Sequence, residues 1–279
     1  MSLWFVSAAM LLYMVREVGM SPLRQAALSS GVQGGFVIGA VLSALFGLAD
    51  RFDPRRLFAF SAVSAGLINL SLVSVVPGSA PAIAARVLTG LLLAGVYPLG
   101  MKIAVGWGDR DRGFLVGALV GALTLGSAPP HLMALGGGTD WRLTVTIASA
   151  GAIVAGLLCL RVGLGPFHAA AAAFNPRVIS TAWKDHRIRL AYVGYLGHMW
   201  ELYAMWAWVG AAAAASCGIS LGDARAQWLA RLTAFVVIGA GGSSCALSGW
   251  VADRIGKAEV TIIAMVVSGL SALATAPTF

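Results

Sequence analysis

The sequence predicts an all-α integral membrane protein that crosses the bilayer several times, and three observations carry this prediction. Of the 279 residues, 59% are hydrophobic and only 11% are charged, whereas a soluble domain averages roughly 25% charged residues. Apolar segments of about 20 residues, the length that crosses a bilayer as a helix, recur along the chain. Most of the 35 glycines lie inside these segments, where small residues allow transmembrane helices to pack closely.

Eight segments are long and apolar enough to be full crossings, and a shorter apolar run precedes them. The run from Met1 to Val15 ends at Arg16-Glu17 and is too short to cross a bilayer unaided. A signal peptide would carry basic residues at its start, and none is present before Trp4. We therefore favour a partial first helix over a signal peptide. The predicted spans are 29–49, 57–76, 84–106, 113–135, 143–162, 188–213, 229–251 and 259–276.

The formal net charge of +8 comes from residues in the short connectors between the apolar segments. Loops oriented by the positive-inside rule have this distribution, so we do not expect nucleic acid as a partner. Alternate connectors carry thirteen Lys and Arg on one side and six on the other, which predicts that the first set faces the cytoplasm, with the inner membrane of a bacterium as the expected location. The first set is Arg51, Arg55, Arg56, Lys102, Arg110, Arg112, Arg161, Arg177, Lys184, Arg187, Arg189, Arg254 and Lys257; the second is Arg16, Arg24, Arg86, Arg142, Arg225 and Arg231.

The longest connector, residues 163–187, has the Pro, Ala and charge mix of a linker. It predicts a division of the chain into a six-helix half at 1–162, with a partial first helix, and three helices of a second half at 188–279.

Small residues recur every four positions in two of the predicted spans. One stripe comprises Gly31, Gly35, Gly39, Ser43 and Gly47, and the other Gly113, Gly117 and Gly121. Such stripes bring helix backbones together. They suit helices that slide against their neighbours and equally suit static packing.

Two connectors repeat the tripeptide Ala-Asp-Arg at matching helix ends, within 47–56 and 249–257. A charged turn repeated in two halves is typical of transporters built from repeats. The second copy resembles the loop motif G-x-x-x-D-R-x-G-R-R/K of the major facilitator superfamily (MFS) of secondary transporters. The first copy keeps the Asp-Arg core but has Phe46, Asp53 and Pro54 where the motif has its first glycine, its turn glycine and a basic residue.

Two further segments resemble motifs of the same family. Arg86-x-x-x-Gly90, continuing through Ala94-Gly95, is similar to the fourth-helix motif, whose arginine is associated with proton coupling. Gly117 to Pro130 is similar to part of the fifth-helix motif of antiporters but lacks the glycine before the proline, so antiport is not inferred.

The resemblance covers essentially the whole chain and implies an MFS-type helical bundle that moves a small solute by alternating access. The family norm is twelve helices, so an incomplete version is expected, without helices ten to twelve and much of helix one. The alternative is a truncated or degenerate membrane chain without transport activity of its own.

The repeated loops are the candidate cytoplasmic gate. An Asp and an Arg at the ends of adjacent helices are expected to pair across the cytoplasmic mouth, and an exposed pair is worth only roughly 0–1 kcal/mol, which suits a lock that opens in every cycle. The alternative is that these charges only anchor helices at the interface. The candidate gate residues are Asp50, Arg51, Arg55, Asp253, Arg254 and Lys257.

Ionisable groups inside the spans are the candidate solute and proton pathway, because a charge at the bilayer centre is costly and usually functional. His198 and Glu201 lie three residues apart on one helical face, where a desolvated carboxylate and an imidazole suit proton exchange. A structural hydrogen bond to a neighbouring helix is the alternative for Glu201. Arg86 is included through the family resemblance, and Tyr97, Tyr203 and Trp206 as candidate lining residues.

The sequence contains no phosphate-binding glycine loop, no paired metal ligands and no nucleophile with a plausible base. The cysteines, Cys159, Cys217 and Cys245, have no metal-ligand spacing. We therefore predict no enzymatic activity, no cofactor and no metal. The expected partners are the lipid bilayer, a small solute and protons.

Overall fold

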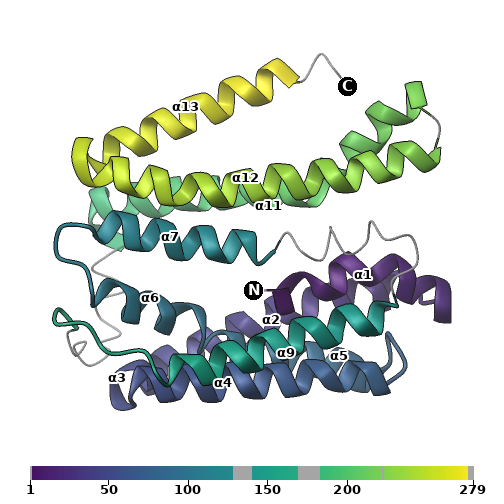
Figure 1. The fold of residues 1–279 in the computed structure, drawn as a ribbon, viewed down its shortest axis with the longest axis horizontal. Coiled ribbons are helices and arrows are strands. Elements are labelled where there is room, and N and C mark those ends of the chain that lie inside the picture. The colour runs from purple at the N-terminus through teal and green to yellow at the C-terminus, as the bar shows by residue number, and fades with distance from the viewer. Residues whose placement is uncertain (1, 128–139, 169–182, 222, 276–279) are drawn as a thin grey trace.

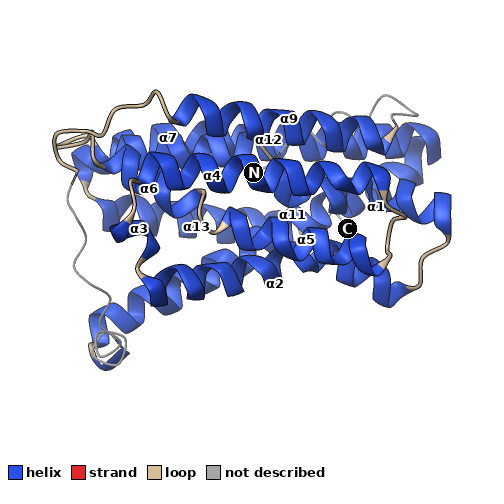
Figure 2. Ribbon diagram, turned by 90° about the horizontal axis from the view of Figure 1, so that it is seen from below, coloured by secondary structure: helices blue, strands red, loops and turns tan. Residues whose placement is uncertain are grey.

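The computed structural model describes residues 2–127, 140–168, 183–221 and 223–275, and these residues form a bundle of long helices without a strand (Figures 1 and 2). The helices are α1 (Ser2–Val18), α2 (Pro22–Phe46), α3 (Leu48–Arg51), α4 (Pro54–Leu70, extended by a 3-10 turn at Ser71–Ser74), α5 (Ala80–Leu93), α6 (Tyr97–Val105), α7 (Arg112–Leu125), α9 (Trp141–Cys159), α11 (His186–Leu221), α12 (Asp223–Ile255) and α13 (Lys257–Thr275).

Six of the predicted crossings are helices that are long and apolar enough to span a membrane. They are Pro22–Phe46, Pro54–Ser74, Ala80–Val105, Trp141–Cys159, Trp228–Ile255 and Lys257–Ala274. The span predicted at 188–213 lies in α11, whose 36 residues correspond to about 54 Å of helix. The span predicted at 113–135 begins with the shorter apolar helix α7 and continues beyond the described residues. The structure confirms an all-α, multi-pass membrane protein.

Local sequence signals explain where several helices begin. Asp53 and Asp140 accept hydrogen bonds from the backbone N–H groups of Arg55 and Arg142, two residues further on. These carboxylates satisfy N–H groups that have no partner inside the first turn of a helix. Ser79 caps α5 in the same way, through the N–H of Ala82.

One predicted span, 84–106, is divided into two helices, α5 and α6. Residues 94–96 form a turn between them, and Pro98 lies in the first turn of α6. Proline has no backbone N–H and its ring clashes with the carbonyl group four residues before it, which favours an interruption of the α-helix here. The break places Tyr97 at the first position of α6.

Helices α1, α2, α4, α5 and α9 enclose the core of the first half. Leu3, Val6, Val32 and Ala65 are almost fully buried there. The close approach of α2 to α5 depends on Gly35, because a Cβ at this position would overlap the backbone of Val87. The α2 stripe of small residues thus serves close packing within this half.

Contact between helices α1–α9 and helices α11–α13 is concentrated, among the described residues, on the pair α7 and α12. Glycines line this contact from both sides: Gly113 faces Gly249, and Gly121 faces Gly242. A Cβ on Gly117 would overlap the carbonyl of Cys245. The second predicted stripe therefore forms the joint between the two parts of the chain.

The connectors gather at two ends of the bundle (Figure 1). The basic end, on the left in Figure 1, carries residues 47–53, 106–111 and 160–168 and the turn at Gly256. The opposite end, on the right, carries residues 19–21 and 75–79. The connectors richest in Lys and Arg thus lie together, as the charge pattern predicts. Most of the predicted linker at 163–187, with Arg177, lies outside the described residues.

Candidate functional site

Arg86 on α5 is fully buried in the first half. Its Nη1 donates to the carbonyl oxygen of Leu3 at 2.8 Å and to Oδ1 of Asn69 at 2.8 Å, and its Nη2 donates to the carbonyl oxygen of Trp4 at 3.0 Å. Asn69 in turn donates to Oγ of Ser149 at 2.9 Å. This chain of hydrogen bonds joins α1, α4, α5 and α9.

No carboxylate contacts Arg86 among the described residues, and its buried Nε has no partner there. A buried cation without a counter-ion is expensive unless hydrogen bonds compensate it, and here carbonyl and amide oxygens do so. In this conformation Arg86 positions the first helix against the rest of its half.

Aromatic rings lie where α11 meets the first half. The ring of Trp206 contacts Phe5 of α1, with centroids 5.3 Å apart, and Tyr203 on its own helix, with centroids 5.8 Å apart. Tyr97 lies at the start of α6, and no ring contact joins it to these side chains among the described residues. We call Phe5, Tyr203 and Trp206 the aromatic seam. It contains two of the sequence-predicted pathway residues and connects α11 to α1.

Glu201 and His198 lie on another side of α11, toward α13. The Oγ of Ser268 on α13 donates a hydrogen bond to Oε1 of Glu201. The Nδ1 of His198 is 3.8 Å from Oε2 of the same carboxylate. These two side chains are 48% and 38% exposed, and in the part of the chain that the structure describes no hydrogen bond or ion pair joins them to Arg86. The structure therefore separates the predicted pathway residues into a titratable pair, the aromatic seam, Tyr97 and a buried arginine.

Asp253 at the basic end of α12 binds the start of α7. Its Oδ1 accepts from the backbone N–H of Gly113 and its Oδ2 from that of Phe114, both at 2.8 Å. These are the second and third residues of α7, whose own N-cap residue, Asp111, makes no side-chain capping bond. A carboxylate from another helix thus caps the N-terminus of α7. This contact crosses from one part of the chain to the other.

Asp50, the equivalent residue of the first loop, has a different kind of partner. It pairs with Lys102 of α6 at 2.8 Å, and Lys102 also donates to the carbonyl of Ala49 at 2.9 Å. We expected an Asp and an Arg to pair across the cytoplasmic mouth, and the observed partners are different. Asp50 pairs with a lysine inside its own half, and Asp253 accepts hydrogen bonds from backbone N–H groups.

The remaining gate residues make local contacts. Arg55 pairs with Asp53 at 2.7 Å and holds the pKa of that carboxyl at about 2. The guanidinium of Arg254 lies over the ring of Trp250, 3.4 Å from its centroid. Arg51 and Lys257 are exposed. None of these side chains bridges the two parts of the chain among the described residues.

The two Asp-Arg loops turn differently because one of them lacks the turn glycine. Gly256 has φ +114° between α12 and α13, a conformation that favours glycine. In the first loop the left-handed residue is Gly47, with φ +58°, and Asp53 instead caps α4. The departure of the first copy from the family motif thus changes the route of the chain, while both loops still end at the basic end.

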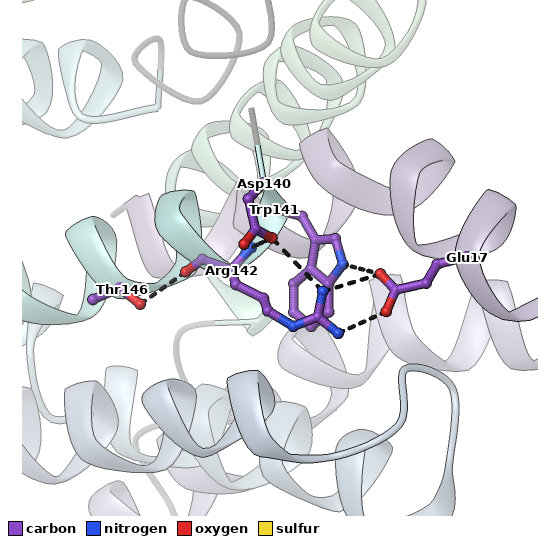
Figure 3. A network of polar contacts seen from close by, with 5 residues as sticks. All are labelled: Glu17, Asp140, Trp141, Arg142 and Thr146. Atoms are coloured by element: carbon purple, nitrogen blue, oxygen red, sulfur yellow. Dashed lines mark hydrogen bonds and ion pairs between the residues drawn. The ribbon is translucent and has the colours of Figure 1, made fainter. Parts of the chain in front are cut away.

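A second polar network lies at the opposite end, and the sequence reasoning did not identify it (Figure 3). Glu17 at the end of α1 accepts from Trp141 Nε1 at 2.6 Å and from Arg142 Nη2 at 2.6 Å. Arg142 also stacks on Trp141, 4.4 Å from the ring centroid. These hydrogen bonds lower the pKa of Glu17. The only sequence signal was the presence of unlike charges at two helix ends on the same predicted side.

Comparison with known proteins decides the family. The sequence profile described as Major Facilitator Superfamily matches residues 1–279. The chain belongs to the Major Facilitator Superfamily. A comparison with curated proteins finds none that matches. Membership supports a secondary transporter in general and an integral, multi-pass location, and MFS proteins are in general not enzymes. No group of potential metal ligands occurs among the described residues.

Membership of the MFS is consistent with two Asp-Arg loops at matching helix ends. It does not specify the contacts of the loop side chains, which come from the structure. Sequence reasoning missed Asn69, Ser149 and Ser268, which are uncharged polar residues in mostly apolar segments. It also missed the backbone N–H groups of Gly113 and Phe114, which no sequence pattern marks as ligands of a distant carboxylate. The fifth-helix motif reaches Pro130, outside the described residues.

Proposed function

We propose that this chain transports a small solute by alternating access, with the movement of protons coupled to that of the solute. The observation that carries the proposal is the joint between α7 and α12. Among the described residues it is the one extensive helix contact between the two parts of the chain, and it is made by facing glycines. Smooth backbone surfaces of this kind permit one rigid half to rock against the other.

The Asp253 contact closes the basic end of this joint. Its two hydrogen bonds tie α12 to the start of α7, and they break when the halves separate there. Asp50 and Lys102 move together because both belong to the first half. The proposed gate therefore depends on Asp253, with Arg254 and Lys257 beside it, and the Asp50 pair stabilises the first half.

Glu201 and His198 are the proposed proton-carrying pair. The Nδ1 of His198 lies 3.8 Å from Oε2 of Glu201, and histidine is the side chain whose charge changes most readily near neutral pH. Ser268 provides a hydroxyl donor on the other side of the carboxylate. The aromatic seam is the proposed solute path, because the rings of Phe5 and Trp206 pack edge-to-face between the two parts of the chain.

A solute-dependent proton-flux screen in proteoliposomes tests the proposal. The purified protein is reconstituted with a pH-sensitive dye inside, and sugars, organic acids, inorganic anions and organic cations are added in turn. Proton flux with at least one solute, absent from protein-free vesicles, is the expected result. No flux and no solute exchange with any class would favour a membrane chain without transport activity of its own.

The proposed orientation places the basic end in the cytoplasm of a bacterial cell, because most Lys and Arg lie there. Single cysteines at the basic end are expected to resist a membrane-impermeant thiol reagent in intact cells. Labelling of those positions from outside would reverse the orientation.

A further inference from the structure

An apolar groove lies between α2, α4 and α5 near the basic end. It has a volume of about 290 Å³, and its wall includes Leu42 and Phe46 of α2 and Leu57 and Phe60 of α4. Two serines, Ser43 and Ser61, provide its polar side chains. Phe46 and Phe60 are 56% and 65% exposed, so the groove is open on one side.

The groove has the length and polarity of a lipid site. From Gly39 to Phe46 it follows seven residues of α2, which correspond to about 10 Å. The hydrocarbon core of one leaflet is about 15 Å thick, so the groove follows roughly two-thirds of it. An apolar chain lying in the groove would cover the exposed faces of Phe46 and Phe60.

Two arginines lie at the end of the groove where a lipid headgroup would be. The Nε of Arg51 is 4.0 Å from the position that a Cβ on Gly47 would take, directly after Phe46. Arg56 precedes Phe60 by one turn on the same face of α4. Both side chains are exposed, and neither guanidinium has a hydrogen-bonding or ionic partner among the described residues. Two free guanidinium groups above an apolar groove complement a phosphate above an acyl chain.

We propose that this groove binds one anionic phospholipid, with an acyl chain between α2 and α4 and its phosphate on Arg51 and Arg56. Another copy of the chain is the less favourable occupant. A two-fold contact through the groove would bring four guanidinium groups together at one membrane surface, and like charges repel there. The site does not depend on the proposed transport activity.

Native mass spectrometry of the purified chain tests the site. The protein in detergent is mixed with phosphatidylglycerol or phosphatidylcholine of the same acyl chains, and bound lipid is counted. Wild-type protein is expected to bind phosphatidylglycerol more tightly. The double variant Arg51→Gln/Arg56→Gln should lose about fivefold in phosphatidylglycerol affinity for each arginine, with phosphatidylcholine binding unchanged.

Two further variants locate the lipid. Ser43→Phe fills the groove and is expected to weaken binding of both lipids. Arg187→Gln/Arg189→Gln removes the same charge from the exposed start of α11 and should retain wild-type affinity. Equal binding of the two lipids by wild-type protein would overturn the proposal. So would an equal loss in the α11 variant, or a dimer that Ser43→Phe abolishes without changing lipid binding.

Discussion

Asp253 is expected to protect two backbone amides of α7 from hydrogen exchange. The N–H groups of Gly113 and Phe114 belong to the first turn of α7, where no intrahelical acceptor is available. Asp253 provides their acceptors, and the N-cap residue Asp111 provides no side-chain bond. Replacing Asp253 with Ala should therefore deprotect these two amides selectively.

The size of the effect follows from the geometry. Loss of an N-cap acceptor costs about 0.5–2 kcal/mol, and loss of a negative charge at a helix N-terminus costs about 0.3–1 kcal/mol. The contact is partly exposed, so a sum of roughly 1–3 kcal/mol is expected, which corresponds to an exchange rate about 5 to 150 times faster. Asp253→Asn keeps an acceptor oxygen, so its acceleration of exchange should lie near the lower limit of this range.

Hydrogen-exchange mass spectrometry on a peptide spanning residues 112–116 measures this change. The start of α9 is the internal reference, since Asp140 caps it from within its own helix. Asp50→Asn is the matched control, because Asp50 pairs with Lys102 inside the first half and should leave α7 unchanged. Unchanged exchange at Gly113 and Phe114 in Asp253→Ala, or equal acceleration in Asp50→Asn, would refute the reasoning.

Three further outcomes are expected, each measured by thermal unfolding in detergent. Asn69→Ala leaves a buried guanidinium donor without its partner and should lower the free energy of unfolding by about 1–3 kcal/mol, whereas Ser149→Ala should lower it by less. An equal loss in both variants, or no loss in either, would contradict the proposed network. Gly117→Val should strongly lower the midpoint temperature of unfolding, because the new valine side chain would overlap the carbonyl of Cys245. Gly34→Ala should leave the midpoint unchanged, because nothing lies within 4 Å of the added Cβ. Because hydrogen bonds from Arg142 and Trp141 lower the pKa of Glu17, its carboxylate stabilises the fold above its ordinary pKa, and this contribution is lost as pH falls through the lowered pKa. Glu17→Gln should therefore be less stable than wild type at pH 7 and equal to it in acid, and a pH-independent difference would argue against the ion pair.

The sequence was sufficient to predict the helical spans because a bilayer imposes a single requirement, about 20 apolar residues per crossing. The position of the basic connectors followed from the same pattern and the charge count. Prolines and capping residues such as Asp53 mark helix starts, but the break before Tyr97 was not expected, since residues 84–106 are apolar throughout their length apart from Arg86 and Lys102.

The partners of the charged residues were beyond the reach of sequence reasoning. Asp253 binds backbone N–H groups 140 and 139 residues away, and backbone groups carry no sequence signature. Asn69 contacts Arg86, and Ser149 contacts Asn69, only because α4, α5 and α9 pack together there. Glu201 was found because a carboxylate inside an apolar span is unusual, yet its hydrogen bond with Ser268 of α13 depends on how the helices are arranged in space.

Coupled uptake by the Glu201→Gln variant tests the central claim most directly. Glutamine keeps the shape and hydrogen-bonding capacity of the side chain but cannot titrate. In proteoliposomes supplied with a solute that the flux screen identifies, this variant should lose accumulation driven by a pH gradient while solute exchange at equal pH continues, and His198→Ala should shift the pH optimum without the same complete loss. Accumulation against a gradient by Glu201→Gln, with an unchanged proton-to-solute ratio, would contradict the assignment of the proton-carrying group.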